Sequence, residues 1–417
     1  MSGTKPTPGF HKAIEAGRIV PAMASAAITD RSEALRTELI SARKQTDALF
    51  RMIAPEALYD RPIPERHRLV FYLGHLEAFD WNVLARFSLG QSSFHPEFDR
   101  LFERGIDPAP GRARQDSPRD WPSRAEVEAY GSKTREWIDS HWSDLSPWLR
   151  QLVVEHRQMH AETLGYLLHA LPYDRKLPGS GEPPAERAAP LNPPISVAAG
   201  TAMLGKSRES FGWDNEHLAH DIFVPEFRIS KFKISNGEYL DFVREGGPAP
   251  HFWTRENGQW FYRGMFAQMP LPLDWPVWVT WRQASAYAEW RGLALPTEAQ
   301  FHRAAALTSP DPLRDNFGFH HWDPIAVDAD HEQADAAAPM QMTGNGWEWT
   351  RDVFAPFAGF ESDPAYPLYS TDFFDGEHYV LKGASPRTAS ILTRPSFRNW
   401  FRPDYPYMYA GFRVVEN

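Results

Sequence analysis

A Pro-rich stretch at residues 172–195 divides the 417-residue chain into two parts of different composition. It consists mainly of Pro, Gly, Glu, Arg and Ala, with too few apolar side chains to pack and too much proline to form a helix. We therefore interpret it as a linker. Because 417 residues are too many for one ordinary hydrophobic core, we expect a domain at 1–171 and a second at 196–417.

The first part has the pattern of a helical bundle. We expect helices at residues 30–53, 65–80, 123–142 and 147–171, with a long irregular loop at 105–122. Asp30 and Ser32 are candidate N-caps of the first helix, and Ser123 with Glu126 forms a capping box for the third. Four helices with one long connection indicate a four-helix bundle.

The second part is rich in loops. Short apolar runs predict strands at 222–224, 227–229, 278–280, 379–381 and 411–415, and helical spacing predicts helices at 236–245 and 282–291. The remainder is rich in Gly, Pro, Asp and Trp. Loops of this kind need a rigid scaffold, and they commonly carry function.

Charge and apolar patterning exclude several classes of partner. Lys plus Arg number 44 against 54 Asp plus Glu, and no basic stripe is evident, so we expect no nucleic acid partner. The most apolar early stretch, residues 19–28, is interrupted by Pro21 and is shorter than the roughly 20 residues that span a bilayer. Since the polar residues 2–17 before it are too many for the start of a signal peptide, we expect a cytoplasmic protein without a membrane partner.

The chain contains no cysteine. Disulfides, thiolate metal sites, iron–sulfur clusters and cysteine nucleophiles are therefore excluded. Any metal must be held by nitrogen and oxygen ligands, and the 16 histidines are the obvious source of nitrogen.

The sharpest local feature is a histidine pair, His156 and His160, on the predicted fourth helix. Residues four apart lie on one helical face, so one rigid element can present both imidazoles to one ion. His75, in the predicted second helix, is the best third ligand, whereas Glu162 points elsewhere and suits a supporting role. Three imidazoles fit octahedral Fe(II) with open positions or tetrahedral Zn with one water, and ordinary structural histidines remain the alternative.

A second set of motifs is far more specific. It comprises residues 200–205, 224–230, 236–239, 276–281, 295–298, 344–349 (Gly-Asn-Gly-Trp-Glu-Trp), 397–400 (Phe-Arg-Asn-Trp) and 411–413. In this order the motifs resemble the formylglycine-generating-enzyme-like (sulfatase-modifying-factor) domain, a relative of the C-type lectin fold, over nearly all of 196–417. The oxidase that gives this fold its name uses cysteines to hold copper, and this chain has none. That chemistry is excluded.

The whole architecture resembles the iron-dependent sulfoxide synthases of ergothioneine and ovothiol biosynthesis and the related selenoneine synthases. The resemblance implies an α+β multidomain protein, in which a DinB-like four-helix bundle precedes the C-type-lectin-like domain. It also implies Fe(II) on His75, His156 and His160 between the two domains. O2 would be activated there, and sulfur or selenium would be joined to an imidazole carbon of hercynine (trimethylhistidine).

The resemblance implies further site residues. Tyr366 and Tyr369 resemble the family's paired tyrosines, so Tyr366 is the candidate proton donor, and Tyr369 would contact the histidine derivative. A phenol can supply a proton without carrying charge at neutral pH. Asn399 and Trp400 match the family's substrate-holding Asn-Trp, and aromatic faces such as Trp400 suit a quaternary ammonium, which cannot donate hydrogen bonds.

Departures from the family's pattern concern both the donor and hercynine. Synthases that use γ-glutamylcysteine typically read Asn-Trp-Asp, whereas Phe401 stands here in place of the Asp that binds the donor's amine. Met159 replaces a frequent Gln, so the contacts with hercynine must differ in part. The loop with Arg112 and Arg114 lacks the family's usual sequence, although these arginines remain candidate substrate contacts. We therefore expect a sugar-borne donor, as in selenoneine synthases, to fit better than an amino-acid head group.

Three alternatives remain open at this stage. The same fold could make ergothioneine from γ-glutamylcysteine or cysteine. A non-catalytic lectin-like binding protein tethered to a bundle is an alternative of another class and would need no metal. A zinc hydrolase ranks below both, because no dedicated general base accompanies the three histidines.

Overall fold

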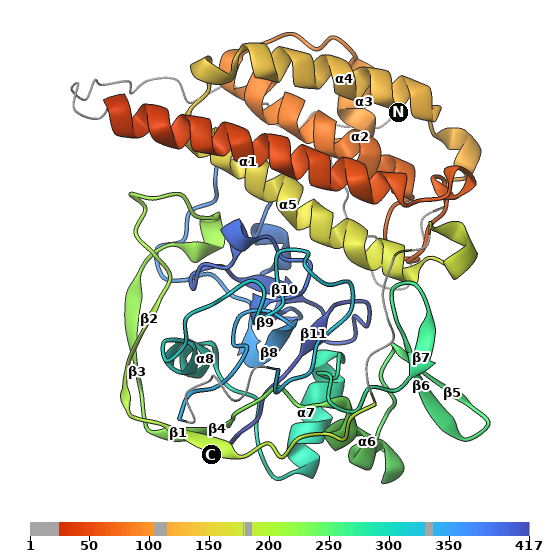
Figure 1. Cartoon of the computed structure of the whole chain (residues 1–417). Coiled ribbons are helices and arrows are strands. Elements are labelled where there is room, and N and C mark those ends of the chain that lie inside the picture. Colours follow the sequence, from red (N-terminus) through yellow and green to blue (C-terminus); the bar gives the residue numbers. More distant parts are fainter. Residues whose placement is uncertain (1–24, 104–114, 178, 180–185, 330–336, 417) are drawn as a thin grey trace, which may run out of the picture.

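A computed structural model describes residues 25–103, 115–177, 179, 186–329 and 337–416. Its first part contains α1 (Ser25–Arg51), α2 (Leu69–Asp80), α3 (Pro96–Leu101), α4 (Arg124–Ser140) and α5 (Pro147–Ala170). A π-helical segment, Trp81–Ser88, continues α2. The long helices form one layer, with α1 against α5 and α2 against both α4 and α5 (Figure 1). Helix α5 is the lowest of them in this view and faces the mixed part of the chain.

The predicted helix termini are correct at α4 and α5 but wrong at α1 and α2. Ser123 caps α4 through the predicted capping box. Ser32, in contrast, lies inside α1, and its hydroxyl accepts a hydrogen bond from Arg150. Helix α2 begins only at Leu69, because the Leu69 and Val70 amides donate to the carbonyls of Asp60 and Leu58 and tie its first turn to the preceding loop. The short helix α3 was not predicted.

The mixed part is built from small sheets. One three-stranded sheet has the order β1 (Pro194–Val197), β4 (Phe227–Ser230), β12 (Val415–Glu416), and a four-stranded sheet has the order β10 (Asn399–Phe401), β9 (Tyr379–Ala384), β8 (Gly346–Val353), β11 (Ala410–Gly411). A hairpin of β2 (Gly200–Leu204) and β3 (His220–Val224) and a sheet of β5 (Trp253–Glu256), β6 (Gln259–Arg263) and β7 (Gln268–Pro270) complete it. The helices here are α6 (Asn236–Arg244), α7 (Trp281–Trp290) and α8 (Glu298–Ala305).

Two predicted strands differ from the structure. Residues 278–280 form no strand, because the Val277 amide donates to Ile234 and the Val279 amide to Ala410, so no continuous ladder forms with either neighbour. Residues 411–415 divide between β11, parallel to β8, and β12, antiparallel to β4. Helix α8 was missed, although Thr297 and Gln300 form a capping box that signals its start.

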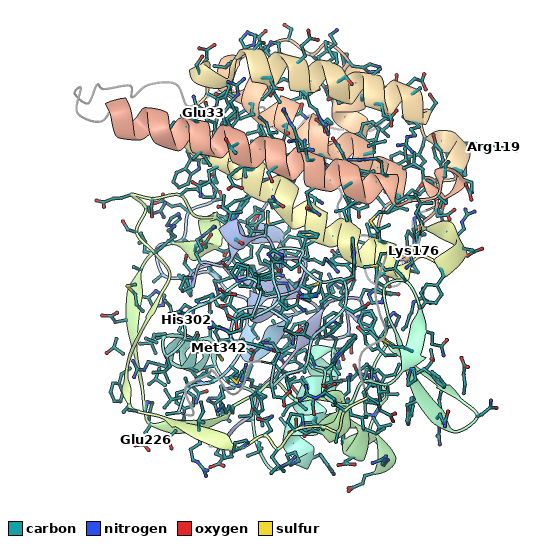
Figure 2. All side chains as sticks on the ribbon, in the orientation of Figure 1. Glu33, Arg119, Lys176, Glu226, His302 and Met342 are labelled. Atoms are coloured by element: carbon teal, nitrogen blue, oxygen red, sulfur yellow. The ribbon has the colours of Figure 1, made fainter. Side chains whose placement is uncertain are left out.

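Residues 175–177, at the start of the predicted linker, form hydrogen bonds with the helical part, whereas most other described residues of the linker are exposed or half-buried. The Ala54 amide donates to Arg175 O at 3.1 Å, and Lys176 forms an isolated bridge with Ile53. The buried Lys176 Nζ donates to Leu168 O at 2.7 Å near the end of α5 (Figure 2). Backbone and side-chain hydrogen bonds therefore compensate for the shortage of apolar surface.

One hydrophobic cluster runs without interruption from the helical layer into the mixed part. It includes Leu39 of α1, Leu76 of α2 and Leu164 of α5 together with the buried Trp347 and Trp349 of β8. Helix α5 is buried on nearly every face because it lies between the two layers. Within the described residues, no helix has the length and apolar character needed to cross a membrane.

Candidate metal centre and cavity

Helix α5 carries an unusual number of buried polar side chains. Glu155, His156, Arg157, Gln158 and Glu162 are all at most 7% exposed. Burying a polar or charged group costs free energy unless it finds a partner, so each of these residues requires one. Arg157 finds its partners on α2, on one side of α5, and Glu155 and Glu162 find theirs in the mixed part, on the other.

His75 of α2 meets His156 and His160 of α5. One nitrogen of each imidazole lies within 4.8 Å of the others, and the Nε2 atoms of His75 and His160 are 3.2 Å apart. Two nitrogens bound to one ion at about 2.1 Å each and at right angles would be about 3.0 Å apart, close to this value. The predicted three histidines are therefore brought together in a geometry that can hold a metal ion.

The hydrogen bonding of these histidines is that expected of metal ligands rather than of ordinary core histidines. His75 Nδ1 donates to Phe102 O at 2.7 Å, which leaves Nε2 as a free lone pair on the side of the cluster. Among the described residues, neither ring nitrogen of His156 nor Nδ1 of His160 has a hydrogen-bond partner. A His75–His160 hydrogen bond would satisfy two rings but would leave His156 without a partner, whereas a shared ion accounts for all three.

Burial keeps the three imidazoles neutral. It lowers the pKa of His75 to about 4, against the opposing hydrogen bond to Phe102. The pKa values of His156 and His160 also lie well below the usual value, first because of burial and then because of neighbouring positive charge. Neutral imidazole is the form that binds a metal, so the cluster is ready to bind at neutral pH.

Arg157 holds the two ligand-bearing helices together. Its fully buried guanidinium donates to Asp80 Oδ2 at 2.7 Å, to Glu77 Oε1 at 3.1 Å and to Leu76 O at 3.2 Å, all on α2. Because Arg157 follows His156 and Glu77 lies two residues beyond His75, these bonds set the position of one ligand helix against the other. The sequence contained no signal for this pairing.

Glu162 connects α5 to the mixed part. Its carboxylate accepts hydrogen bonds from Trp347 Nε1 at 2.7 Å, Ser385 Oγ at 2.6 Å and Thr388 Oγ1 at 2.8 Å. It is not among the clustered ligand atoms. Glu162 therefore has the supporting position that its spacing from the histidines predicts, and it anchors the helix on the side opposite Arg157.

A cavity of about 520 Å³ opens next to the histidines, between α5 and β10. The predicted site residues that line it are His156, His160, Tyr366, Tyr369, Asn399, Trp400 and Phe401. His75 lies behind the other two histidines and is not part of the lining. Arg112 and Arg114 lie outside the described residues. The arrangement can hold a small molecule directly beside a metal ion.

The two tyrosines have different neighbours. The Tyr366 ring meets Phe79 and His156 edge-on, with centroids 5.2 and 6.1 Å away. Tyr369 stacks on Trp213 at 4.2 Å and donates its hydroxyl to Met159 Sδ at 3.3 Å. Burial raises the pKa of Tyr369 well above the usual value, so this phenol keeps its proton.

Strand β10 supplies one aromatic wall. Trp400 stacks one face on Phe354 at 4.2 Å, which closes that face to a ligand. It also lies edge-on to Tyr369 at 5.2 Å and tilted against Phe373 at 5.5 Å. Asn399 Oδ1 accepts a hydrogen bond from the Trp400 amide at 2.9 Å, which leaves its side-chain amino group as the available donor. Both residues project from a strand paired with β9, which gives them a rigid support.

Sequence reasoning missed Arg66, which lines the cavity from the segment before α2. Its Nε donates to Tyr405 Oη at 3.0 Å, and its guanidinium carbon lies 5.8 Å from the ring centroid of Phe401. Phe401 in turn stacks on Tyr405 at 5.0 Å. These contacts join segments more than 300 residues apart, and no local pattern in the sequence signals them.

Asp214, next to Trp213, gives a prediction about pH. Burial raises its pKa from 3.8 to about 6, and its Oδ2 has no hydrogen-bond partner among the described residues. Because its pKa is higher in the native state, Asp214 binds its proton more tightly there than in the unfolded chain. The contribution of Asp214 to the free energy of unfolding therefore falls by about 2–3 kcal/mol as the pH rises from about 4 to about 6.

Asp214→Asn should remove this dependence, because the amide imitates the protonated acid. We expect the variant to match the parent at pH 4 and to exceed its free energy of unfolding at pH 7 by about 2 kcal/mol. Urea unfolding of both proteins across this range measures the difference. A difference that does not change with pH would contradict the assignment.

Known proteins are similar to this chain over both of its parts. Residues 180–417 match the family described as sulfatase-modifying factor enzyme 1-like domain. Ergothioneine biosynthesis protein 1 of Schizosaccharomyces pombe is 30% identical over 88% of this chain, which spans only 54% of that protein. Hercynine oxygenase of Mycolicibacterium thermoresistibile is 29% identical over 94% of this chain and 96% of its own length. Hercynine oxygenase of Mycobacterium tuberculosis is 32% identical over 63% of this chain and 70% of its own.

Proposed function

This chain belongs to the family of the hercynine oxygenases and ergothioneine biosynthesis protein 1, and on that premise we propose that it is an Fe(II)- and O2-dependent enzyme acting on hercynine. The reaction joins sulfur or selenium to an imidazole carbon of hercynine. The observation that carries the proposal is the cluster of His75, His156 and His160, three neutral imidazoles beside a cavity lined by aromatic residues.

The ligand set supports iron as the metal. Three imidazoles leave three positions of an octahedral ion open, enough for O2 and for a substrate atom side by side. Bound Fe(II) supplies the activation of O2. The chain's own contribution is to keep the ligands neutral by burial and to hold α2 against α5 through Arg157.

The aromatic wall supports hercynine as the substrate. The trimethylammonium group of hercynine is a cation that cannot donate hydrogen bonds, so its favourable partners are aromatic faces. Trp400 lines the cavity, and Tyr369 lies edge-on to it at 5.2 Å. Asn399 can donate a hydrogen bond to the carboxylate of the same substrate through its amide.

Tyr366 is the group we assign to proton donation. Its ring lies 6.1 Å from that of His156 at the edge of the cavity, which is the side on which a metal ion would bind. A neutral phenol can deliver a proton there without placing a charge next to the metal. Tyr369, with its hydroxyl directed to Met159, is less suited to that task.

For the donor we propose a selenosugar, with γ-glutamylcysteine or cysteine as the alternative. The Phe401 ring lies against Tyr405 and the Arg66 guanidinium, and position 401 offers no carboxylate to a donor's ammonium group. Burying that ammonium unpaired would be costly, whereas a sugar ring can lie against the aromatic rings. The names of the relatives favour the thiol alternative, so the experiment must compare the two.

The test is to incubate the Fe(II)-loaded protein with hercynine, O2 and each donor in turn and to measure product masses. We expect a hercynine adduct containing selenium with the selenosugar and slower or no turnover with γ-glutamylcysteine and cysteine. If only the thiols give a product, the donor is a thiol and the selenosugar assignment is wrong. Absence of any hercynine adduct with every donor, together with no bound iron, would favour a non-catalytic binding protein.

A substitution at position 401 tests the donor assignment separately. Phe401→Asp introduces a carboxylate that can pair with the ammonium of an amino-acid donor. We expect kcat/KM for γ-glutamylcysteine to rise about fivefold to tenfold relative to the sugar donor, since a charge-assisted hydrogen bond contributes about 1–1.5 kcal/mol. Phe401→Asn is the uncharged control, and an equal change in both variants would show that charge is irrelevant.

A further inference from the structure

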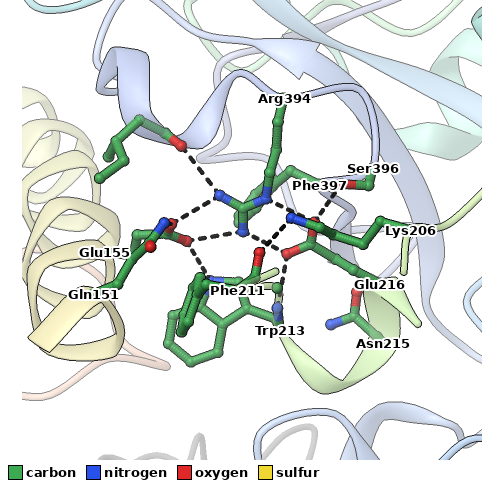
Figure 3. A network of polar contacts seen from close by, with 12 residues as sticks. Gln151, Glu155, Lys206, Phe211, Trp213, Asn215, Glu216, Arg394, Ser396 and Phe397 are labelled. Atoms are coloured by element: carbon green, nitrogen blue, oxygen red, sulfur yellow. Dashed lines mark hydrogen bonds and ion pairs between the residues drawn. The ribbon is translucent and has the colours of Figure 1, made fainter. Parts of the chain in front are cut away.

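A buried ion cluster joins α5 to the mixed part close to the cavity (Figure 3). Arg394 lies between two carboxylates that are inaccessible to solvent, Glu155 of α5 and Glu216 of the mixed part. Its Nη1 and Nη2 donate to the two oxygens of Glu155 at 2.8 and 2.9 Å, and its Nε donates to Glu216 Oε2 at 2.8 Å. Glu155 immediately precedes His156, so the cluster acts on the ligand helix itself.

The same two carboxylates fix Trp213 at both ends. Trp213 Nε1 donates to Glu155 Oε2 at 2.9 Å, and its backbone amide donates to Glu216 Oε1 at 2.8 Å. Figure 3 shows its indole directly below the Arg394 guanidinium. With the side-chain and backbone donors both engaged, the plane of the indole is determined by the positions of Glu155 and Glu216.

That indole supports a wall of the cavity. Trp213 stacks on Tyr369 with centroids 4.2 Å apart and ring planes 27° apart. Tyr369 also donates to Met159 on α5 at 3.3 Å, and its ring lies beside Trp400. A continuous series of contacts therefore leads from Arg394 through Trp213 to a ring that faces the substrate cavity.

The buried ion cluster is better suited to orienting its residues than to stabilising the fold. Removing charges from water is costly, so a buried ion cluster adds little net stability compared with apolar packing. A guanidinium that donates to two carboxylates does, however, define their relative position, because its donors are arranged in a rigid plane. A lysine carries the same charge without that geometry.

We propose that Arg394 and Trp213 are positioning residues that set the ring of Tyr369 against the hercynine side of the cavity. Neither residue lines the cavity, so each acts through Tyr369. This inference rests on the proposed function, because it assigns Tyr369 to contact with hercynine. It predicts that binding of hercynine depends on contacts outside the pocket, at the junction of the two parts of the chain.

Two variants test the proposal. Trp213→Phe keeps an aromatic ring for Tyr369 but removes the donor to Glu155, and all charges of the cluster remain. Arg394→Lys keeps the charge but removes the planar donor array. We expect the Kd for hercynine, measured by calorimetry on anaerobic Fe(II)-loaded protein, to rise about tenfold in both, in line with the large effects of small displacements in active sites. The KM for hercynine should rise with it, and the KM for the donor should not change.

The control is Arg43→Gln, which breaks a buried arginine's ion pair with Asp139 between α1 and α4, away from the cavity. It should lower the thermal midpoint without changing the Kd for hercynine. A double variant gives the sharper result: in a Tyr369→Leu background, Trp213→Phe should cause no further rise in Kd, because the two residues act in series.

The outcomes separate the two proposals. If the wild-type protein binds hercynine and the Trp213 and Arg394 variants bind it equally well, the positioning role is wrong while the proposed function stands. Additive effects of Trp213→Phe and Tyr369→Leu would likewise overturn it. If the wild-type protein does not bind hercynine at all, the proposed function fails and the inference fails with it.

Discussion

Replacing His160 by alanine is expected to abolish stoichiometric metal binding and to lower kcat by at least about a thousandfold. Substitutions that only support a metal ligand typically cost 10- to 100-fold, and loss of a ligand should exceed that. His160 Nε2 lies 3.2 Å from His75 Nε2, so its removal leaves two imidazoles that cannot enclose an ion from three sides. Metal analysis after anaerobic loading and product formation together measure the effect.

His169→Gln is the matched control, since His169 is a buried histidine on the same helix. Its ring forms hydrogen bonds with Arg263 O at 2.6 Å and with Tyr409 Oη at 3.2 Å, and it is not part of the metal cluster found among the described residues. We expect this variant to retain one metal ion and most of the activity per folded molecule. A His160→Ala protein that binds one equivalent of iron as tightly as the parent would refute the ligand assignment.

Arg157→Met is expected to lower the free energy of unfolding by about 3–5 kcal/mol, the usual cost of leaving buried charges without their partner. Asp80 is inaccessible to solvent and Glu77 nearly so, and Arg157 contacts both. Burial raises the pKa values of both acids; at Glu77 the charges of Arg157 and Arg135 outweigh it and lower the pKa to about 2. Without Arg157, Asp80 would lose its ion pair in a dry interior, whereas Glu77 would keep its pair with Arg135 at 2.7 Å. Urea unfolding of the metal-free protein measures the loss.

A second substitution tests the cause. Arg157→Met with Asp80→Asn should recover part of the lost stability, because the Asp80 side chain, which has lost its guanidinium partner, is then neutral. Arg124→Met, which removes only the exposed i, i+4 pair with Glu128, should change the free energy of unfolding by less than about 0.5 kcal/mol. Equal losses from Arg157 and Arg124 would show that the buried cluster has no special role.

Local sequence patterns correctly predicted those features that depend only on residues within one helix or strand. The capping box of Ser123 and Glu126 correctly predicts the start of α4, and the four-residue spacing of His156 and His160 correctly places both rings on one face of α5. Prediction failed where a segment depends on distant partners. Residues 278–280 match a strand pattern, but the amides of Val277 and Val279 donate to two separate segments, and residues 175–177 are held by hydrogen bonds that composition does not reveal.

By itself, the sequence determined which chemistry was available and which residues could take part. The absence of cysteine excluded thiolate chemistry, helical spacing paired two histidines, and family motifs selected the residues at 366, 369 and 399–401. The sequence also offered His75 as the third ligand, but only the tertiary structure brought this residue to the pair and decided that Arg66 and Arg394 would join the two parts of the chain. The physical reason is that these contacts join residues 85, 339 and 239 positions apart. Such contacts depend on how buried charges find partners after the layers pack, and local spacing does not encode that.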